Sequence, residues 1–320
     1  EDWIRAGSFV IMPQLDVGVA YDDNVYRIDR RKIDDFVLHA APEVRAQSRW
    51  SRHLLDLHVG GRLNYYVDET REVGGKFDAA ARGIIDVTQG IKILPYVVYR
   101  FGQEEFGEGE TVSSSLARRL VDPVSYHVVQ TGASIAKHFN RLWVELGGAL
   151  TYTNYDDSVL QSALGWDRDF RSGTVAEGIA KVGYEVGPKT SIFVESRYNE
   201  RDYEAQFFDS SGYRVLGGVS YELTRLSRAE VGVGYMEQQS DFGSQADIST
   251  WTYRGFLLWE LSPFVQLSLS GNRELGAPSV IAGYTSQVNT DVAARIDYAI
   301  LRNLVLTGIV GYTWSDFFDI

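Results

Sequence analysis

Apolar and polar residues alternate along most of this chain with a period of two. In the stretch GYRVLGGVSYELTR, Tyr213, Val215 and Val219 share one parity, whereas Arg214 and Glu222 share the other. Because successive side chains of a strand point to opposite faces of a sheet, the alternation predicts strands with one apolar face and one polar face. A two-residue link separates this stretch from the next alternating segment, which favours a β-hairpin.

The same pattern recurs along the chain and predicts fifteen strands. Their approximate ranges are 12–21, 34–50, 53–66, 77–89, 91–101, 125–138, 141–155, 169–185, 190–203, 212–224, 227–239, 248–261, 263–273, 286–300 and 303–316. We find no longer internal repeat and no linker rich in Pro or Ser, so we expect a single domain.

The links between these strands alternate strictly between short and long. Short links include Gly90, Asn140 and 187–190, and the long ones are 22–33, 67–76, 102–124, 156–168, 204–211, 240–247 and 274–285. Outer-membrane barrels have short periplasmic turns and long extracellular loops, and closing the sheet removes the unpaired edges that lipid could not satisfy. We therefore predict an all-β fold: a transmembrane antiparallel up-and-down β-barrel of about fifteen strands.

Aromatic residues provide a second test, since membrane barrels carry aromatic rings at both lipid interfaces. On the apolar parity near the long loops lie Tyr21, Phe36, Tyr65, Phe101, Phe170, Tyr198, Tyr213, Tyr235, Trp251 and Tyr312, and near the short turns lie Tyr184, Tyr221, Trp259 and Tyr298. This sorting by parity and by height favours a membrane barrel over a soluble all-β domain.

Composition excludes several classes of function. The 320 residues include no cysteine and five scattered histidines, and the net charge is -12, which disfavours thiolate metal sites, disulfides and nucleic-acid binding. No nucleophile elbow or Gly-rich phosphate loop occurs, so we expect no enzyme, no catalytic residue, no metal site and no cofactor. Asp22, Asp23 and Asn24 could offer oxygens to a divalent cation, but an ordinary turn is the favoured interpretation.

The polar parity is rich in charges of both signs, which predicts a hydrated lumen. We select as lumen-lining candidates Arg45, Arg62, Arg82, Arg100, Arg197, Arg214, Arg254, Arg295, Glu145, Glu195 and Glu230. Arginine rows could attract acidic solutes or anionic sugars. The alternative, which we favour for any single pair, is that these charges pair across strands and only solvate the wall.

The longest link, 102–124, has an acidic, Gly-rich first half and a helix-capable second half. Folded inward, it would narrow the pore and set a transverse field against the wall arginines. Its candidate constriction residues are Glu104, Glu105, Glu108, Glu110, Arg118 and Arg119. An exposed flexible loop is an equally good interpretation.

The N-terminal stretch GSFVIMPQLDVGVAYDDNVYR, residues 7–27, resembles the opening of the outer-membrane barrels called putative beta-barrel porin type 2. The resemblance implies a barrel of sixteen or more strands in the outer membrane of a Gram-negative bacterium, surrounded by lipopolysaccharide and phospholipid. Members of that family are found beside exopolysaccharide synthesis and export systems, which makes a polysaccharide a candidate partner. The resemblance carries no catalytic or ligand-binding residue.

The two ends of the chain raise separate expectations. Residues 1–11 read as a periplasmic N-terminal extension, which leaves 12–320 for the barrel. If the first strand starts on the periplasmic side, the fifteenth runs outward, and the chain ends on Asp319 and Ile320 without the usual terminal aromatic residue. Bacterial single-chain barrels have an even strand count, so we expect the native protein to have a further strand that this chain lacks.

Two functions fit these observations. The first is a hydrophilic, porin-like conduit, for export of a polysaccharide or for passage of polar solutes. The alternative is a plugged structural or anchoring barrel that serves a larger envelope complex and binds periplasmic or envelope proteins. A wide polar lumen suits both functions, so the sequence separates them only weakly.

Overall fold

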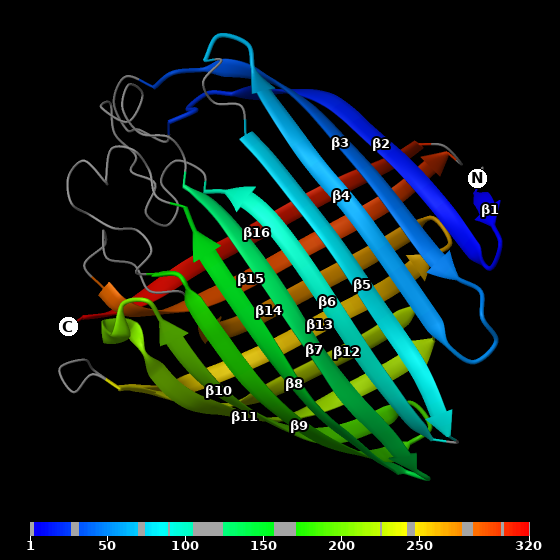
Figure 1. Cartoon of the computed structure of the whole chain (residues 1–320). Coiled ribbons are helices and arrows are strands. Elements are labelled where there is room, and N and C mark those ends of the chain that lie inside the picture. Colours follow the sequence, from blue (N-terminus) through cyan, green and yellow to red (C-terminus); the bar gives the residue numbers. More distant parts are fainter. Residues whose placement is uncertain are drawn as a thin grey trace. The chain divides into compact units, whose positions relative to one another are not determined.

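The computed structural model describes residues 3–26, 32–69, 74–88, 90–104, 124–156, 171–224, 226–241, 247–276, 284–301 and 304–319. These residues form sixteen strands of one sheet, in which the strand order follows the chain from β1 to β16 (Figure 1). The ladders of neighbouring strands are antiparallel, as between β2 and β3 or between β15 and β16. The predicted antiparallel up-and-down all-β fold is thus confirmed.

Apart from β1, the strands are long for a globular sheet and suit a membrane span. Their bounds are β1 (Ile4–Ala6), β2 (Phe9–Asp22), β3 (Asp35–Ser48), β4 (Leu54–Tyr66), β5 (Gly74–Thr88), β6 (Ile91–Gln103), β7 (Ser125–Phe139), β8 (Leu142–Tyr155), β9 (Gly173–Gly187), β10 (Thr190–Tyr203), β11 (Ser210–Thr224), β12 (Ser227–Ser240), β13 (Ile248–Ser262), β14 (Val265–Leu275), β15 (Tyr284–Leu301) and β16 (Leu304–Asp319). None of the described segments is a helix long and apolar enough to cross a membrane.

The strand count exceeds the prediction by one because of β1. This three-residue strand pairs with the start of β2, where Ile4 lies opposite Ile11 and Ala6 opposite Phe9. The sheet therefore includes residues 4–6 and 9–11, which the hydrophobic pattern placed before the first strand. The periplasmic position of residues 1–11 stays a prediction.

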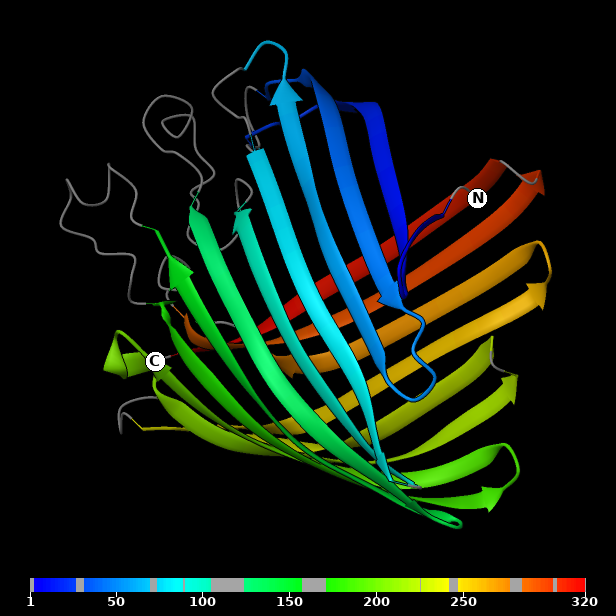
Figure 2. The same cartoon turned by 45° about the vertical axis from the view of Figure 1, so that its right-hand side comes forward.

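The chain divides into two compact units. The first contains Glu1–Ile135, Gly148–Ala176 and Asp202–Gln206, and the second contains Ala136–Gly147, Glu177–Arg201 and Phe207–Ile320. The first unit holds the ladder from β1 to β6. In the second, β11 to β16 lie side by side (Figures 1 and 2).

The short turns have the backbone that tight hairpins need. Gly90, between β5 and β6, has a φ of 80°, and Asn140, between β7 and β8, has a φ of 55°. Glycine and asparagine adopt this left-handed conformation at low cost. At a long-loop end, the backbone N–H of Asn24 donates to Oδ1 of Asp22 over 2.9 Å. This hydrogen bond is typical of an Asx turn, in agreement with the interpretation of Asp22, Asp23 and Asn24 as an ordinary turn.

The two faces of the sheet differ sharply. On β2, the alternate residues Leu15, Val17 and Val19 are each at least 66% exposed, so one face presents aliphatic side chains to the surroundings. Of the fourteen predicted interface aromatics, twelve are exposed: Tyr21, Phe36, Tyr65, Tyr184, Tyr198, Tyr213, Tyr221, Tyr235, Trp251, Trp259, Tyr298 and Tyr312. Phe101 is half-buried against the His127 ring, and Phe170 lies outside the described residues.

Candidate functional site: an ionic network on the polar face

Glu195 on β10 is the centre of an ionic network in the second unit. Its side chain is only 3% exposed, and Oε1 and Oε2 accept hydrogen bonds from Nη1 and Nη2 of Arg254 over 3.0 and 2.8 Å. Nε of Arg197 donates to Oε1 over 3.0 Å, and Nη2 of Arg214 lies 3.6 Å from the same oxygen. One buried carboxylate thus faces three guanidinium groups.

A second carboxylate, Glu230 on β12, extends the network. It accepts hydrogen bonds from Nζ of Lys181 over 3.0 and 3.1 Å and from Nη2 of Arg254 over 3.0 Å. Nζ of Lys181 also lies 4.0 Å from Oε2 of Glu195. Four cations therefore surround two carboxylates, which leaves an excess of positive charge within the network.

These contacts show that the polar face of this unit is concave. Lys181 on β9 reaches Glu230 on β12, and Glu195 on β10 meets Arg254 on β13, so both pairs span three strand spacings. Side chains stand roughly perpendicular to a sheet, and on a flat sheet three spacings would hold their bases roughly 14 Å apart. For side chains that stand upright, these contacts therefore indicate that the strands bend toward the polar side.

Two aromatic rings lie beneath the ammonium group of Lys181, and two glycines leave room for these rings. Nζ of Lys181 lies 4.1 Å from the centroid of the buried Phe193 ring and 5.6 Å from that of Trp143. A Cβ added at Gly218 would come within 2.5 Å of the Phe193 ring, and one at Gly183 within 2.2 Å of the Trp143 ring. The glycines leave space for the two rings, and a cation over an aromatic face gains electrostatic attraction.

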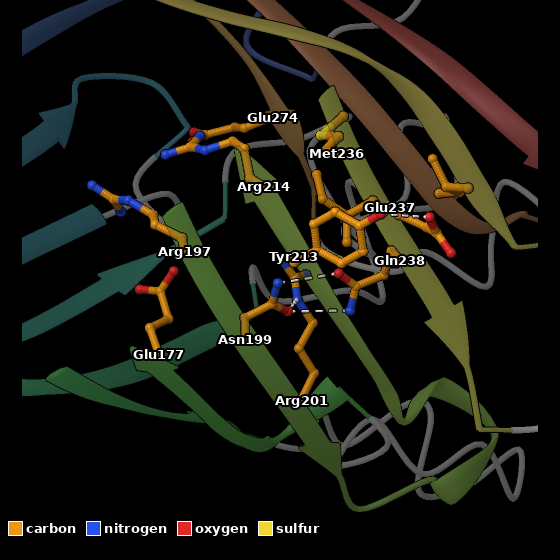
Figure 3. A pocket seen from close by; sticks show the side chains of 12 residues that line it. Glu177, Arg197, Asn199, Arg201, Tyr213, Arg214, Met236, Glu237, Gln238 and Glu274 are labelled. Carbon is orange, nitrogen blue, oxygen red and sulfur yellow. Dashed lines mark hydrogen bonds between the residues drawn. The ribbon is translucent and has the colours of Figure 1, made fainter. Parts of the chain in front are cut away.

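A pocket of about 90 Å³ adjoins the network (Figure 3). On one side, Asn199 and Gln238 exchange two hydrogen bonds between their amides, of 3.2 and 3.1 Å. On another side lie Arg197 and Arg214, which occupy directly opposite positions of β10 and β11. Like charges in such positions repel each other, and Oε1 of Glu195, which both guanidinium groups approach, offsets this repulsion.

Glu177 and Glu274 also line this pocket and flank the two guanidinium groups (Figure 3). Nη1 of Arg201 donates to the carbonyl oxygen of Gly276 at the end of β14 over 3.3 Å, which joins strands four positions apart. The pocket therefore offers a polar solute hydrogen-bond donors and acceptors, together with charged groups of both signs. Within the described part of the chain, no group of three His, Asp or Glu residues is placed to hold a metal ion.

The second unit brings together five predicted lumen-lining residues: Glu195, Arg197, Arg214, Glu230 and Arg254. Arg295 lies apart from them and pairs with Asp297 of its own strand over 2.7 Å. Glu145 is half-buried on β8 and has no ion pair among the described residues. Lys181 was not among the candidates, although its polar-face position was readable from the alternation.

The first unit contains the other four predicted wall arginines. Nη2 of Arg45 lies 2.7 Å from Oδ2 of Asp56 on the neighbouring strand β4. Arg62, Arg82 and Arg100 are exposed and form no ion pair with any described residue. Cross-strand pairing, which we favoured for each single charge, thus describes Arg45 but not the other three.

Only Glu104 of the predicted constriction residues is described. It is buried at the end of β6, where Oε1 accepts a hydrogen bond from Nη1 of Arg171 over 2.7 Å. The guanidinium of Arg171 also lies 4.0 Å from the centroid of the Tyr155 ring. Glu105, Glu108, Glu110, Arg118 and Arg119 lie outside the described residues, so the constriction stays a prediction.

The comparison with protein families agrees with this architecture. The sequence matches the model of the family described as Putative beta-barrel porin 2 over residues 3–320. A search of curated proteins gives no match.

Among solved structures, the chain is similar to two mutants of the ferric enterobactin receptor of Pseudomonas aeruginosa. One is 11% identical with a TM-score of 0.46, and the match covers 95% of this chain and 52% of the receptor. The other, in complex with enterobactin, is 10% identical with a TM-score of 0.43, over 98% of this chain and 54% of the receptor. This chain spans about half the length of these receptors. Because the family model covers almost all of it, the chain belongs to the Putative beta-barrel porin 2 family and is an outer-membrane β-barrel.

Proposed function

We propose that this barrel is a hydrophilic, porin-like conduit for polar solutes in the outer membrane of a Gram-negative bacterium. The observation that carries the proposal is the concave polar face, on which Glu195, Glu230 and Arg254 meet across several strands. In a closed barrel, a concave charged face encloses water, and charged side chains there select among the solutes that pass.

The apolar face supports the membrane part of this proposal. Val231 and Val233 on β12 are 55% and 62% exposed, while the polar-face residues Met236 and Gln238 of the same strand are buried. Exposed aliphatic side chains on strand after strand would be unfavourable in water. The proposed neighbours of this face are the acyl chains of phospholipid and lipopolysaccharide.

Conductance measures the proposed activity directly. Purified protein added to planar lipid bilayers should give stepwise currents, and proteoliposomes should swell in an isosmotic glucose solution. Arg254→Gln removes one positive charge from the ionic network, so it should shift the reversal potential in a salt gradient toward cation selectivity.

Lys137→Gln is the matched control. Lys137 shares the exposed parity of Ile135 and Phe139 on β7, and Nζ lies 4.5 Å from the Phe139 ring centroid, so its loss should leave the reversal potential unchanged. A folded, membrane-inserted protein without current would contradict the conduit. If a periplasmic or envelope protein also co-purified with it, the anchoring barrel would be the better proposal.

A further inference from the structure

A second, larger pocket lies on the polar face of the first unit. Its volume is about 500 Å³, and its wall is drawn from five strands, β3 to β7. The lining residues that carry its chemistry are Arg45, Gln47, Asp56, Arg82, Tyr96 and Arg100. Pockets that hold small organic molecules have volumes of roughly 300–1,000 Å³, so this pocket has the size of a binding site.

The single carboxylate in this pocket is already occupied by neighbours. Oδ2 of the buried Asp56 accepts hydrogen bonds from Nε and Nη2 of Arg45 over 2.9 and 2.7 Å and from the Gln47 amide over 3.2 Å. Arg82 lies directly opposite Asp56 on β5, yet it forms no ion pair within the described part of the chain. Asp56 therefore neutralises Arg45 and leaves Arg82 available.

Arg100 is available for a similar reason. It lies directly opposite Asp78, but Oδ2 of Asp78 is 2.6 Å from Nε2 of His58. Among the described residues, no carboxylate lies within ion-pair distance of Arg100, which is exposed. Arg82 on β5 and Arg100 on β6 thus both line this pocket. The one carboxylate of the pocket, Asp56, is hydrogen-bonded to a different arginine, Arg45.

Tyr96 gives the pocket an aromatic surface that is held in place. Its ring packs against the backbone of Gly132 on β7, where an added Cβ would lie 2.9 Å from the ring carbons Cε1 and Cζ. Only glycine allows this approach. The ring also lines the pocket, directly across the β5–β6 ladder from Arg82.

We infer that this pocket binds a hydroxyl-bearing organic anion of the size and chemistry of a sugar acid. The carboxylate of such a molecule would bind Arg82 and Arg100, since guanidinium–carboxylate hydrogen bonds are charge-assisted and directional. The side-chain amides of Gln47 and Gln130 offer donors and acceptors to hydroxyl groups, and the Tyr96 ring offers a surface to the apolar face of a sugar ring. The inference rests on the proposed conduit, which would deliver the solute to the pocket.

D-glucuronate and D-glucose are suitable probes because they differ only in a carboxylate at the position of a hydroxymethyl group. Saturation-transfer NMR on the detergent-solubilised protein gives both dissociation constants without any current, so a non-conducting barrel would not decide this test. We expect glucuronate to bind at least tenfold more tightly than glucose. Equal affinities for the two sugars would overturn the inference.

Variants separate a built site from a general attraction of anions. The double change Arg82→Gln and Arg100→Gln should abolish the preference for glucuronate over glucose. Tyr96→Ala should instead raise the dissociation constants of both sugars by a similar factor. Lys92→Gln is the matched control, because Lys92 lies on β6, on the same face as Arg100, but outside the pocket. If Lys92→Gln reduced glucuronate binding as much as the arginine changes, the attraction would be general and the inference wrong. Each variant is compared only after its β-sheet circular dichroism matches the unmodified protein.

Discussion

At the scale of single residues, Glu195 is a buried carboxylate surrounded by four cationic side chains. Arg254 and Arg197 donate hydrogen bonds to this buried carboxylate, and Arg214 and Lys181 lie within 4.0 Å of it. Burial of a charge is costly, and this cost is offset only while opposite charges and hydrogen bonds surround it. The network is therefore sensitive to the loss of either carboxylate.

Glu195→Gln tests this sensitivity. The change keeps the shape of the side chain but removes the charge of one of the two network carboxylates, and we expect a loss of about 3–5 kcal/mol in the free energy of unfolding. Urea unfolding in phospholipid vesicles, followed by tryptophan fluorescence, measures the change. Glu222→Gln on the neighbouring strand β11 is the control: Glu222 is exposed, and we expect an effect within about 0.5 kcal/mol. Equal effects of the two changes would contradict the role of Glu195.

At the scale of strand pairs, Gly234 on β12 lies directly against the backbone of β11. A Cβ added at Gly234 would come within 1.8 Å of the carbonyl oxygen of Val215, whereas one added at Gly217 would meet nothing within 4 Å. Because the obstacle at Gly234 is backbone, it cannot rotate away. We expect Gly234→Ala to destabilise the protein by about 1–3 kcal/mol. Gly217→Ala should be neutral or stabilising by up to about 1 kcal/mol in the same urea titration.

The strands themselves were largely predictable from the sequence. The alternation predicted 212–224 for a strand that spans Ser210–Thr224, and 227–239 for one that spans Ser227–Ser240. The error was larger for β9, predicted from residue 169 and observed from Gly173, because Arg171 instead forms its buried ion pair with Glu104. The strand β1 was missed because three residues, Ile4–Ala6, are too few to show a period of two.

The contacts within the candidate site were not predictable in the same way. Parity placed Glu195 and Arg254 on one face, but it carries no information about curvature. Whether the two side chains touch depends on how strongly the sheet bends between β10 and β13. Packing such as that of the Phe193 ring against Gly218 contributes to this bend. For the same reason, the sequence showed that Arg82 and Arg100 share a face but not that Asp56 and Asp78 are engaged by Arg45 and His58.

At the scale of the whole molecule, the apolar and the polar face of the sheet are expected to have different surroundings, lipid and water. Leu15 and Gln14 are consecutive residues near the middle of β2, and both are exposed, so neither has a packed protein environment to disturb. They point to opposite faces because side chains alternate along a strand. The two positions therefore compare the surroundings of the two faces with almost no difference in location.

Introducing arginine at each position measures that difference. Leu15→Arg would place a charge among acyl chains, and we expect a loss of about 2–4 kcal/mol in the free energy of unfolding in phospholipid vesicles. Gln14→Arg would place the same charge on the polar, hydrated face, where we expect a change within about 0.5 kcal/mol. Solvent-exposed positions of a water-soluble sheet would tolerate arginine equally well on both faces. Similar small effects at the two positions would therefore contradict a membrane span, whereas a large cost confined to Leu15 would identify the lipid-facing side of the barrel.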